Sequence, residues 1–277
     1  MNLPFDPNVH LGPFQVAWHG IFTAVGIFFG VWLPVRILRG RVSEDAIYAL
    51  ATPAVIGGIV GARLFHVIDC WSLCGYDANP WLIPQIWTGG IAIVGAVIVG
   101  VITGYVIAIR RGDIPIGGTA DAAAPGIGLG MAIGRIGDII NGEHHAVACG
   151  APGICVTYDN PASLGQGPSF GPGDPRYSAD PVHLAVSYEM VWDLAGVGLA
   201  ILLRRRFAGR APEGRVFWIW LAFQSIGRFL ISFLRIDKPD LFGLYQAQLV
   251  ALVLVALSIP MLITLFRMAR PARTMAA

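Results

Sequence analysis

Three arginines lie inside long apolar stretches of this chain: Arg63, Arg135 and Arg228. An arginine within a bilayer costs about 2.5–3.5 kcal/mol on insertion scales, so it normally faces a protein interior and has a function there. A guanidinium offers two parallel donors to a phosphate group and stays charged in a poorly hydrated site. The three residues therefore indicate binding of an anion, and phosphate is the natural candidate.

The composition indicates which elements must hold these arginines. Hydrophobic residues make up 55% of the 277 residues and charged residues only 13%, with a mean hydropathy of +0.65. Soluble domains carry about 25% charged residues. We therefore expect an all-α polytopic membrane protein, a single integral membrane domain over residues 1–277, with membrane lipids as partners and no nucleic-acid partner. The first fifteen residues lack the basic region of a cleavable signal peptide.

Seven apolar segments are long enough to cross a bilayer core, which needs about 20 residues. They lie near residues 16–35, 46–70, 86–109, 120–141, 185–203, 215–235 and 246–266. The fourth is rich in glycine and polar groups and is the weakest of them. Without it, the chain would have six spans and a different topology.

The basic residues of the connecting loops alternate between the two sides. One side has Arg36, Arg39, Arg41, Arg110, Arg111, Arg204, Arg205, Arg206, Arg210, Arg215, Arg267, Arg270 and Arg273, and the other has Arg176, Arg235 and Lys238. Cytoplasmic loops carry the excess of Lys and Arg. We therefore predict seven spans with the N-terminus outside and the C-terminus in the cytoplasm.

With this topology, the polar residues of the spans gather in the outer half of the membrane. They are Arg63, His66 and Asp69; Arg135, Asp138, Asn141 and Glu143; Gln224, Arg228, Ser232 and Arg235; and His19, Thr88, His183, Tyr188, Glu189 and Asp193 near segment ends. Pairs such as Arg135 with Asp138 could merely lock helices together, but the set has cations to spare. A phospholipid presents its phosphate at this depth. The pattern predicts a protein that handles phospholipid head groups from the external side.

The small and sulfur-containing residues point to structure. Gly126, Gly130 and Gly134 repeat at four-residue spacing, which favours close helix packing. All four cysteines fall on the external, oxidising side, where Cys70–Cys74 and Cys149–Cys155 are candidate disulfides. Free thiols are the alternative, and no cysteine or histidine spacing favours a metal site. A long external loop rich in Gly and Pro covers residues 142–186.

One run of residues resembles a known signature. Gly134 to Glu143 (GRIGDIINGE) resembles the signature of the prolipoprotein diacylglyceryl transferases, roughly Gly-Arg-x-Gly-Asn-Phe-x-Asn-x-Glu. Further matches follow in the family's order, among them Gly61-Ala62-Arg63, Gly89-Gly90, Asp121, Pro125, Tyr188-Glu189, Gly227-Arg228-Phe229, Phe233-Leu234-Arg235 and Gln248. The resemblance spans about residues 61 to 248 and implies seven helices with the N-terminus outside.

The resemblance also implies a reaction. The family transfers the diacylglyceryl group of phosphatidylglycerol to the lipobox cysteine thiol of a preprolipoprotein, which releases glycerol 1-phosphate and leaves a thioether. It uses no metal or cofactor. Arg135 and Arg228 would then hold the phosphate, and Glu143 with Asn141 would orient the head group. Arg63, Asp138, Gly137, Gly89, Gly90 and Arg235 would complete the binding site for lipid and signal peptide. The site would face outward from a bacterial inner membrane.

Four residues depart from the family's pattern. Thr88 stands where the family has a histidine, Asp138 where it has an asparagine, Ser232 where it has a glutamate and His19 where it has a tyrosine. Threonine is a poor general base, so we expect a replacement; His19, His66, His144 and Glu143 are the candidates, and the sequence does not choose among them. The departures also leave open a non-catalytic or differently specific lipid-binding paralogue. A transporter is less favoured, because the inner halves of the helices are almost entirely apolar.

Overall fold

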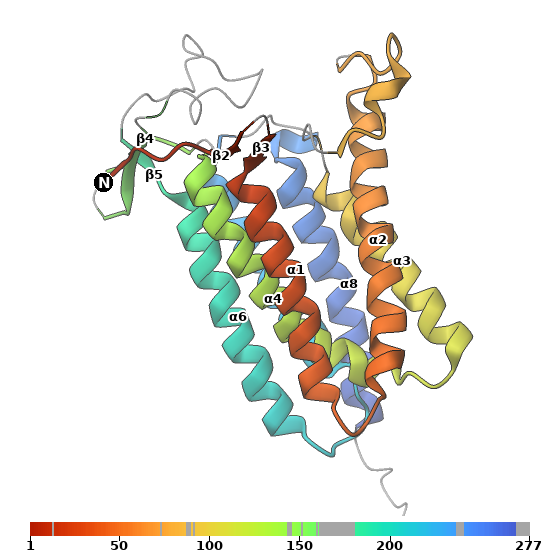
Figure 1. Ribbon diagram of the computed structural model, residues 1–277. Coiled ribbons are helices and arrows are strands. Elements are labelled where there is room, and N and C mark those ends of the chain that lie inside the picture. The colour runs from red at the N-terminus through yellow and green to blue at the C-terminus, as the bar shows by residue number, and fades with distance from the viewer. Residues whose placement is uncertain are drawn as a thin grey trace, which may run out of the picture. The chain divides into compact units, whose positions relative to one another are not determined.

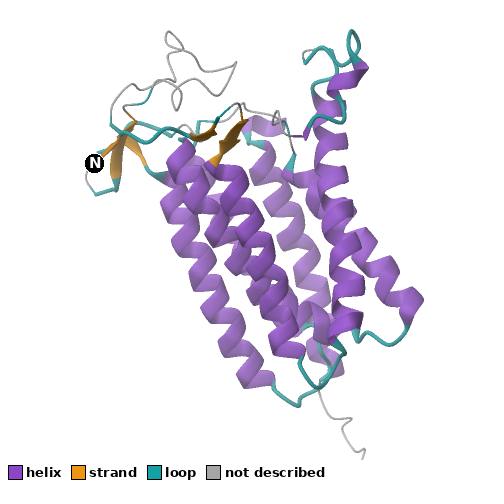
Figure 2. Ribbon diagram, viewed as in Figure 1, coloured by secondary structure: helices purple, strands orange, loops and turns teal. Residues whose placement is uncertain are grey.

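The computed structural model describes residues 1–12, 14–72, 74–86, 90, 92–142, 146–150, 152–158, 160, 181–236 and 241–269. It divides into two compact units, residues 1–34 with 120–277 and residues 35–119. Long helices dominate both units (Figures 1 and 2). The single membrane domain expected from the sequence stays a prediction.

The helices follow the predicted apolar segments. Their bounds are α1 (Trp18–Leu38), α2 (Glu44–Asp69), α3 (Ile93–Arg111), α4 (Ile116–Asn141), α6 (Ala185–Phe207), α7 (Arg215–Ile231) and α8 (Gln246–Met268). Single 3-10 turns cover Pro80–Leu82, Ser232–Leu234 and Leu241–Gly243. The largest shift is at α3, which begins at Ile93 rather than near residue 86. Gly90 has φ +75°, which is incompatible with a right-handed α-helix, so α3 cannot include this residue.

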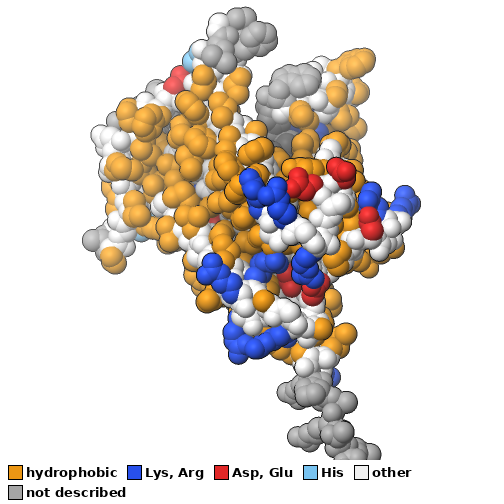
Figure 3. Space-filling view, turned by 60° about the horizontal axis from the view of Figure 1, so that its bottom comes forward, with side chains coloured by type: hydrophobic (Ala, Val, Ile, Leu, Met, Phe, Trp, Pro, Cys, Tyr) orange, Lys and Arg blue, Asp and Glu red, His pale blue; other side chains and the backbone are white. Residues whose placement is uncertain are grey.

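Six helices within the described residues are long and apolar enough to cross a membrane: α1, α2, α4, α6, α7 with its extension to Leu234, and α8. Their outer faces carry exposed aliphatic side chains, such as Val253 of α8, as lipid-facing helices do. Figure 3 shows Lys and Arg side chains gathered at the helix ends on the face turned forward. The protein is therefore a multi-pass membrane protein. The seventh span, on α3, and the orientation stay predictions.

Short strands accompany the helices of this mostly helical protein. β2 (Asn8–Leu11) and β3 (Phe14–Ala17) form an antiparallel hairpin. β1 (Asn2–Leu3) pairs in parallel with β4 (Cys155–Tyr158), which pairs antiparallel with β5 (Val182–His183). Strands of two to four residues from distant parts of a chain leave too little alternation for a sequence pattern to reveal.

Glycines let α1 and α4 approach within one unit. A Cβ added to Gly26 of α1 would lie 2.5 Å from the Gly130 carbonyl oxygen, and one added to Gly126 would lie 2.5 Å from the Gly30 carbonyl oxygen. The predicted packing role is thus confirmed for Gly126 and Gly130. Around the Cβ position of Gly134, no described atom lies within 4 Å, so that part of the prediction is wrong.

A carboxylate of α4 fixes the start of α7. Asp121 accepts hydrogen bonds from the backbone N–H of Gly214 (2.8 Å) and of Phe217 (2.9 Å). These N–H groups lie at the N-terminal end of α7, where backbone N–H groups lack acceptors within the helix. This end also carries the positive end of the helix dipole. Nearby, Ala124, Ala200 and Trp220 pack in one apolar cluster. Together these contacts fix α4, α6 and α7 against one another and so position the polar residues nearer their other ends.

Candidate active site

Glu189 is the centre of a cluster of buried charges in the unit formed by residues 1–34 and 120–277. Its Oε2 lies 2.9 Å from Nη2 of Arg135, and its Oε1 contacts Nη1 of Arg228 and lies 3.5 Å from Nη1 of Arg235. The Glu189 side chain is only 4% exposed. Three guanidinium groups, one from α4 and two from α7 and its extension, therefore converge on one buried carboxylate.

Two further carboxylates surround Arg135. Its Nη1 donates to Oδ2 of Asp138 at 2.9 Å, and its Nε lies 3.9 Å from Oδ2 of Asp193. Asp193 in turn accepts a hydrogen bond from Nε2 of Gln224 at 2.8 Å. Among the described residues of this cluster, arginines and carboxylates are thus equal in number. The expected surplus of cations is wrong here, because α6 supplies two carboxylates to the cluster.

The exposure of the side chains shows which groups a ligand can reach. Arg228 is 29% exposed and Arg135 is 18% exposed, whereas Glu189 is nearly covered. The carboxylate is therefore more deeply buried than the two arginines that it binds.

The imidazole of His19 lies against the same cluster. Its Nδ1 is 2.5 Å from Oδ1 of Asp138, the carboxylate whose other oxygen binds Arg135. Gly137 makes this approach possible, because a Cβ at that position would lie 2.7 Å from the His19 Cα. Asp138 therefore links an imidazole of α1 to a guanidinium of α4.

A tyrosine of β4 covers the end of α4. The hydroxyl of Tyr158 donates to the Ile139 carbonyl oxygen at 3.2 Å. Burial raises the pKa of Tyr158 to about 12, and the negative charge of Asp138 adds to the rise. The phenol is therefore neutral at physiological pH.

Asn141, one turn beyond Gly137, is also buried, with 1% of its surface exposed.

Arg63 belongs to the other unit, residues 35–119, and is 5% exposed. It donates three hydrogen bonds to backbone carbonyl oxygens: Nε to Ile83 (2.7 Å), Nη2 to Leu82 (2.6 Å) and Nη1 to Gly90 (2.8 Å). The guanidinium therefore fastens the segment that leads to the double glycine. Gly90 takes part through its carbonyl group, whereas Gly89 lies outside the described residues.

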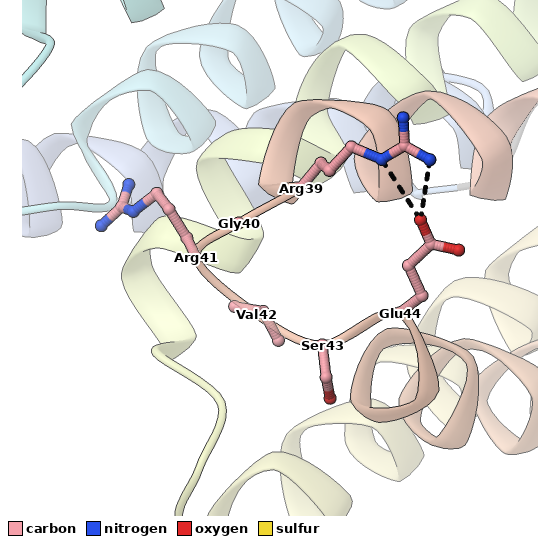
Figure 4. A pocket seen from close by; sticks show the side chains of 6 residues that line it. All are labelled: Arg39, Gly40, Arg41, Val42, Ser43 and Glu44. Atoms are coloured by element: carbon pink, nitrogen blue, oxygen red, sulfur yellow. Dashed lines mark hydrogen bonds and ion pairs between the residues drawn. The ribbon is translucent and has the colours of Figure 1, made fainter.

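One hollow in the described structure is formed by other residues. It has a volume of about 370 Å³ and is lined by Arg39, Gly40, Arg41, Val42, Ser43 and Glu44, in the turn between α1 and α2 (Figure 4). Arg39 and Glu44 are paired there at 3.3 Å, and both are exposed. This hollow is an open surface turn, and it contains none of the predicted site residues.

Comparison with known proteins decides the family. The sequence matches the prolipoprotein diacylglyceryl transferase family over residues 8–264. The phosphatidylglycerol–prolipoprotein diacylglyceryl transferase of Bacillus cereus (strain ZK / E33L) is 38% identical over 252 residues, which covers 91% of this chain and 88% of the relative. The protein of the same name from Dehalococcoides mccartyi (strain BAV1) is 34% identical over 256 residues, 91% and 90% of the two chains.

The chain belongs to the prolipoprotein diacylglyceryl transferase family. The resemblance seen in the signature run is thereby confirmed. The relatives carry the name of a transferase, which does not favour the alternative of a non-catalytic paralogue.

The structure accounts for two of the four departures from the family pattern. His19 and Asp138, which stand where the family has tyrosine and asparagine, contact each other. Ser232 is fully buried and donates to the Arg228 carbonyl oxygen at 2.6 Å. Arg228 nevertheless has a carboxylate partner, Glu189 of α6. Thr88 and Glu143 lie outside the described residues, so their predicted roles stay predictions.

Glu189 and Asp193 are among the polar residues predicted to lie in the outer half of the membrane, but they were not predicted as site residues. Both are 4% exposed, and they lie one helical turn apart on α6. Carboxylates at i and i+4 share one helix face, and a buried pair of this kind requires cationic partners. That spacing was the signal that could have assigned them to the arginines.

Both predicted disulfides are confirmed. Cys70 is bonded to Cys74 and Cys149 to Cys155, with Cα–Cα distances of 5.4 Å and 5.5 Å.

Proposed function

We propose that this chain transfers the diacylglyceryl group of phosphatidylglycerol to the lipobox cysteine of a preprolipoprotein. The reaction leaves a thioether and releases glycerol 1-phosphate. The observation that carries the proposal is the convergence of Arg135 and Arg228 on the buried carboxylate of Glu189, in a chain whose relatives are named for this transfer. We place the protein in the bacterial inner membrane with seven spans, an external N-terminus and the site facing outward.

The phosphate of the lipid binds to Arg135 and Arg228. Glu189 fixes both guanidinium groups before the substrate arrives, so their remaining N–H donors need little reorganisation when the phosphate gains charge as a leaving group. Arg235, the third partner of Glu189, supports the same arrangement. Glu143 and Asn141 orient the glycerol head group. By the resemblance, Arg63, Gly89 and Gly90 are further candidates for contacts to the lipid.

The thiol is activated by His19 and Asp138. With Nδ1 hydrogen-bonded to Asp138, His19 accepts the thiol proton at Nε2, and the carboxylate stabilises the imidazolium that forms. The thiolate then attacks the glyceryl carbon that carries the phosphate. A C–S bond forms, the C–O bond to phosphate breaks, and the phosphate leaves with the electron pair. The positive charge gained by His19 offsets the negative charge gained by the phosphate, so the cluster stays balanced without surplus cations.

The test measures release of the lipid head group. Phosphatidylglycerol labelled in its terminal glycerol is incubated with the purified protein and a lipobox peptide, and released glycerol 1-phosphate is measured. We expect release with the cysteine peptide and none with the matched peptide that carries serine in its place, because the alcohol is a far weaker nucleophile. Equal release of glycerol 1-phosphate without any peptide would indicate hydrolysis of the lipid at its phosphate ester, and it would contradict the proposal.

A further inference from the structure

A second group of reactive side chains lies at the end of α2, and it shares no residue with the arginine cluster. His66 Nε2 lies 3.6 Å from Cys70 Sγ and 3.9 Å from Cys74 Sγ. The three ligand atoms all lie within 4.8 Å of one another. The backbone explains the grouping, since Cys70 N–H donates to the His66 carbonyl (3.0 Å) and Cys74 N–H donates to the Cys70 carbonyl (2.7 Å). Two successive four-residue steps stack the side chains on one side.

The two nitrogen–sulfur separations match a tetrahedral metal site, whereas the two sulfurs are bonded to each other. Zn–S and Zn–N bonds of about 2.3 Å and 2.0–2.1 Å place nitrogen and sulfur about 3.6 Å apart, and two sulfurs about 3.8 Å apart. The two observed nitrogen–sulfur distances already approach the first value. The bonded sulfurs need only separate by side-chain rotation, and Cys74 is exposed. Three protein ligands leave a fourth position for water or another ligand.

The imidazole is held in place by its surroundings. The His66 ring meets the buried ring of Tyr76 edge to face, with centroids 6.1 Å apart. The backbone of Gly90 lies along the Nε2–Cδ2 edge of the ring, so close that a Cβ there would overlap these atoms. Arg63 secures Gly90 through its carbonyl group. A ligand fixed in this way loses little freedom on binding a metal.

From this geometry we infer that His66, Cys70 and Cys74 form a redox-gated site for a thiophilic divalent cation of the zinc class. In the disulfide state, the sulfurs are bonded to each other and provide no thiolate. A dithiol reductant supplies two electrons and two protons, which breaks the S–S bond, leaves two thiols and oxidises the reductant to its own disulfide. Binding of the cation then releases the two thiol protons. The inference does not depend on the transferase activity.

The full-length protein in detergent tests this inference with Co²⁺ as a spectroscopic probe and Zn²⁺ as its competitor. A sample reduced with a phosphine under anaerobic conditions is compared with the untreated disulfide form. We expect one Co²⁺ per reduced chain, with thiolate-to-cobalt charge-transfer absorption that Zn²⁺ abolishes, and no such absorption in the disulfide form. The double variant Cys149→Ser, Cys155→Ser is the matched control, because it removes the other disulfide and keeps the site.

The variants decide which residues bind the probe. His66→Ala is expected to weaken Co²⁺ binding at least tenfold, and Cys70→Ser with Cys74→Ser to abolish the charge-transfer band. Circular dichroism of each variant confirms that its helices are intact. The inference is overturned if reduced wild type binds no Co²⁺, or if the band persists in the Cys70→Ser, Cys74→Ser protein. Binding that is unaffected by His66→Ala would remove the histidine from the site and would likewise overturn it.

Discussion

The Nδ1 atom of His19 lies 2.5 Å from the Oδ1 atom of Asp138, although the two residues are 119 positions apart in the sequence. Each replaces a different residue of the family pattern, tyrosine in one case and asparagine in the other. A carboxylate beside an imidazole fixes its tautomer and stabilises its protonated form. The two residues thus form one acid–base pair.

This contact predicts that the two substitutions depend on each other. His19→Tyr and Asp138→Asn are each expected to lower kcat by about 10–100-fold, since general acid–base catalysis contributes roughly 10²–10⁴-fold. The double variant restores the family pair and should recover part of the loss, with a coupling energy of about 1–3 kcal/mol. Steady-state transfer kinetics measure the cycle. A double variant whose loss equals the product of the two single losses would contradict the coupling.

The approach of α1 to α4 gives a second prediction. Gly137→Ala would place a Cβ 2.7 Å from the His19 Cα, so the helices must separate and the imidazole must leave Asp138. We expect a loss of about 1–3 kcal/mol in unfolding free energy, together with reduced transfer. Gly134→Ala is the matched control on the same helix, because no described atom lies within 4 Å of its Cβ position. Equal effects of the two substitutions on thermal stability and activity would show that the contact is unimportant.

The central carboxylate should matter for stability as well as for catalysis. Glu189→Gln keeps the shape of the side chain but leaves one buried and two partly buried arginines around a neutral amide. Removing one partner of a buried ion pair costs about 3–5 kcal/mol. Thermal unfolding in detergent measures the change. Glu44→Gln, which breaks the exposed pair with Arg39, should cost at most about 1 kcal/mol. If the two variants unfold at the same temperature, the Glu189 cluster does not stabilise the fold.

Tyr158 predicts a pH dependence at the alkaline end. Its pKa is raised to about 12 in the folded protein, whereas an unfolded tyrosine titrates near 10. Between these values the unfolded chain has lost the proton and the folded chain still holds it. This group's contribution to stability is therefore complete below about pH 10, and it is lost as the pH rises toward 12.

The substitution Tyr158→Phe tests this assignment. It should reduce the alkaline slope of the unfolding free energy by up to about 1.4 kcal/mol per pH unit between pH 10 and 12. Denaturant unfolding at a series of pH values measures that slope. An identical slope in the variant would show that the phenol is not buried as described.

The membrane spans could be predicted because about 20 apolar residues in a row leave few alternatives to a helix. α6 begins at Ala185 and α8 at Gln246, as expected. The predicted start of α3 was wrong because the backbone conformation of Gly90, which the apolar pattern does not reveal, excludes a helix there. The strands were not predicted, because β1 and β4 are brought together only by tertiary structure.

The site was predictable in part for similar reasons. Arg135 and Arg228 were found because an arginine in an apolar stretch is costly and therefore conspicuous. Glu189 was recognised only as a polar residue, because its role depends on three partners from other segments. Arg63 looks the same in the sequence as the other two arginines, yet its donors go to backbone carbonyl groups. Only the positions of the carbonyl groups of Leu82, Ile83 and Gly90 distinguish it.

The most direct measurement is mass spectrometry of a lipobox peptide after incubation with phosphatidylglycerol and the purified protein, with Arg135→Ala alongside. The account predicts a diacylglyceryl thioether on the cysteine with wild type and at least a hundredfold less with the variant, since one preorganised donor contributes about 10²–10³-fold. Folded wild-type protein that binds phosphatidylglycerol but yields no thioether would contradict it, as would undiminished product with Arg135→Ala.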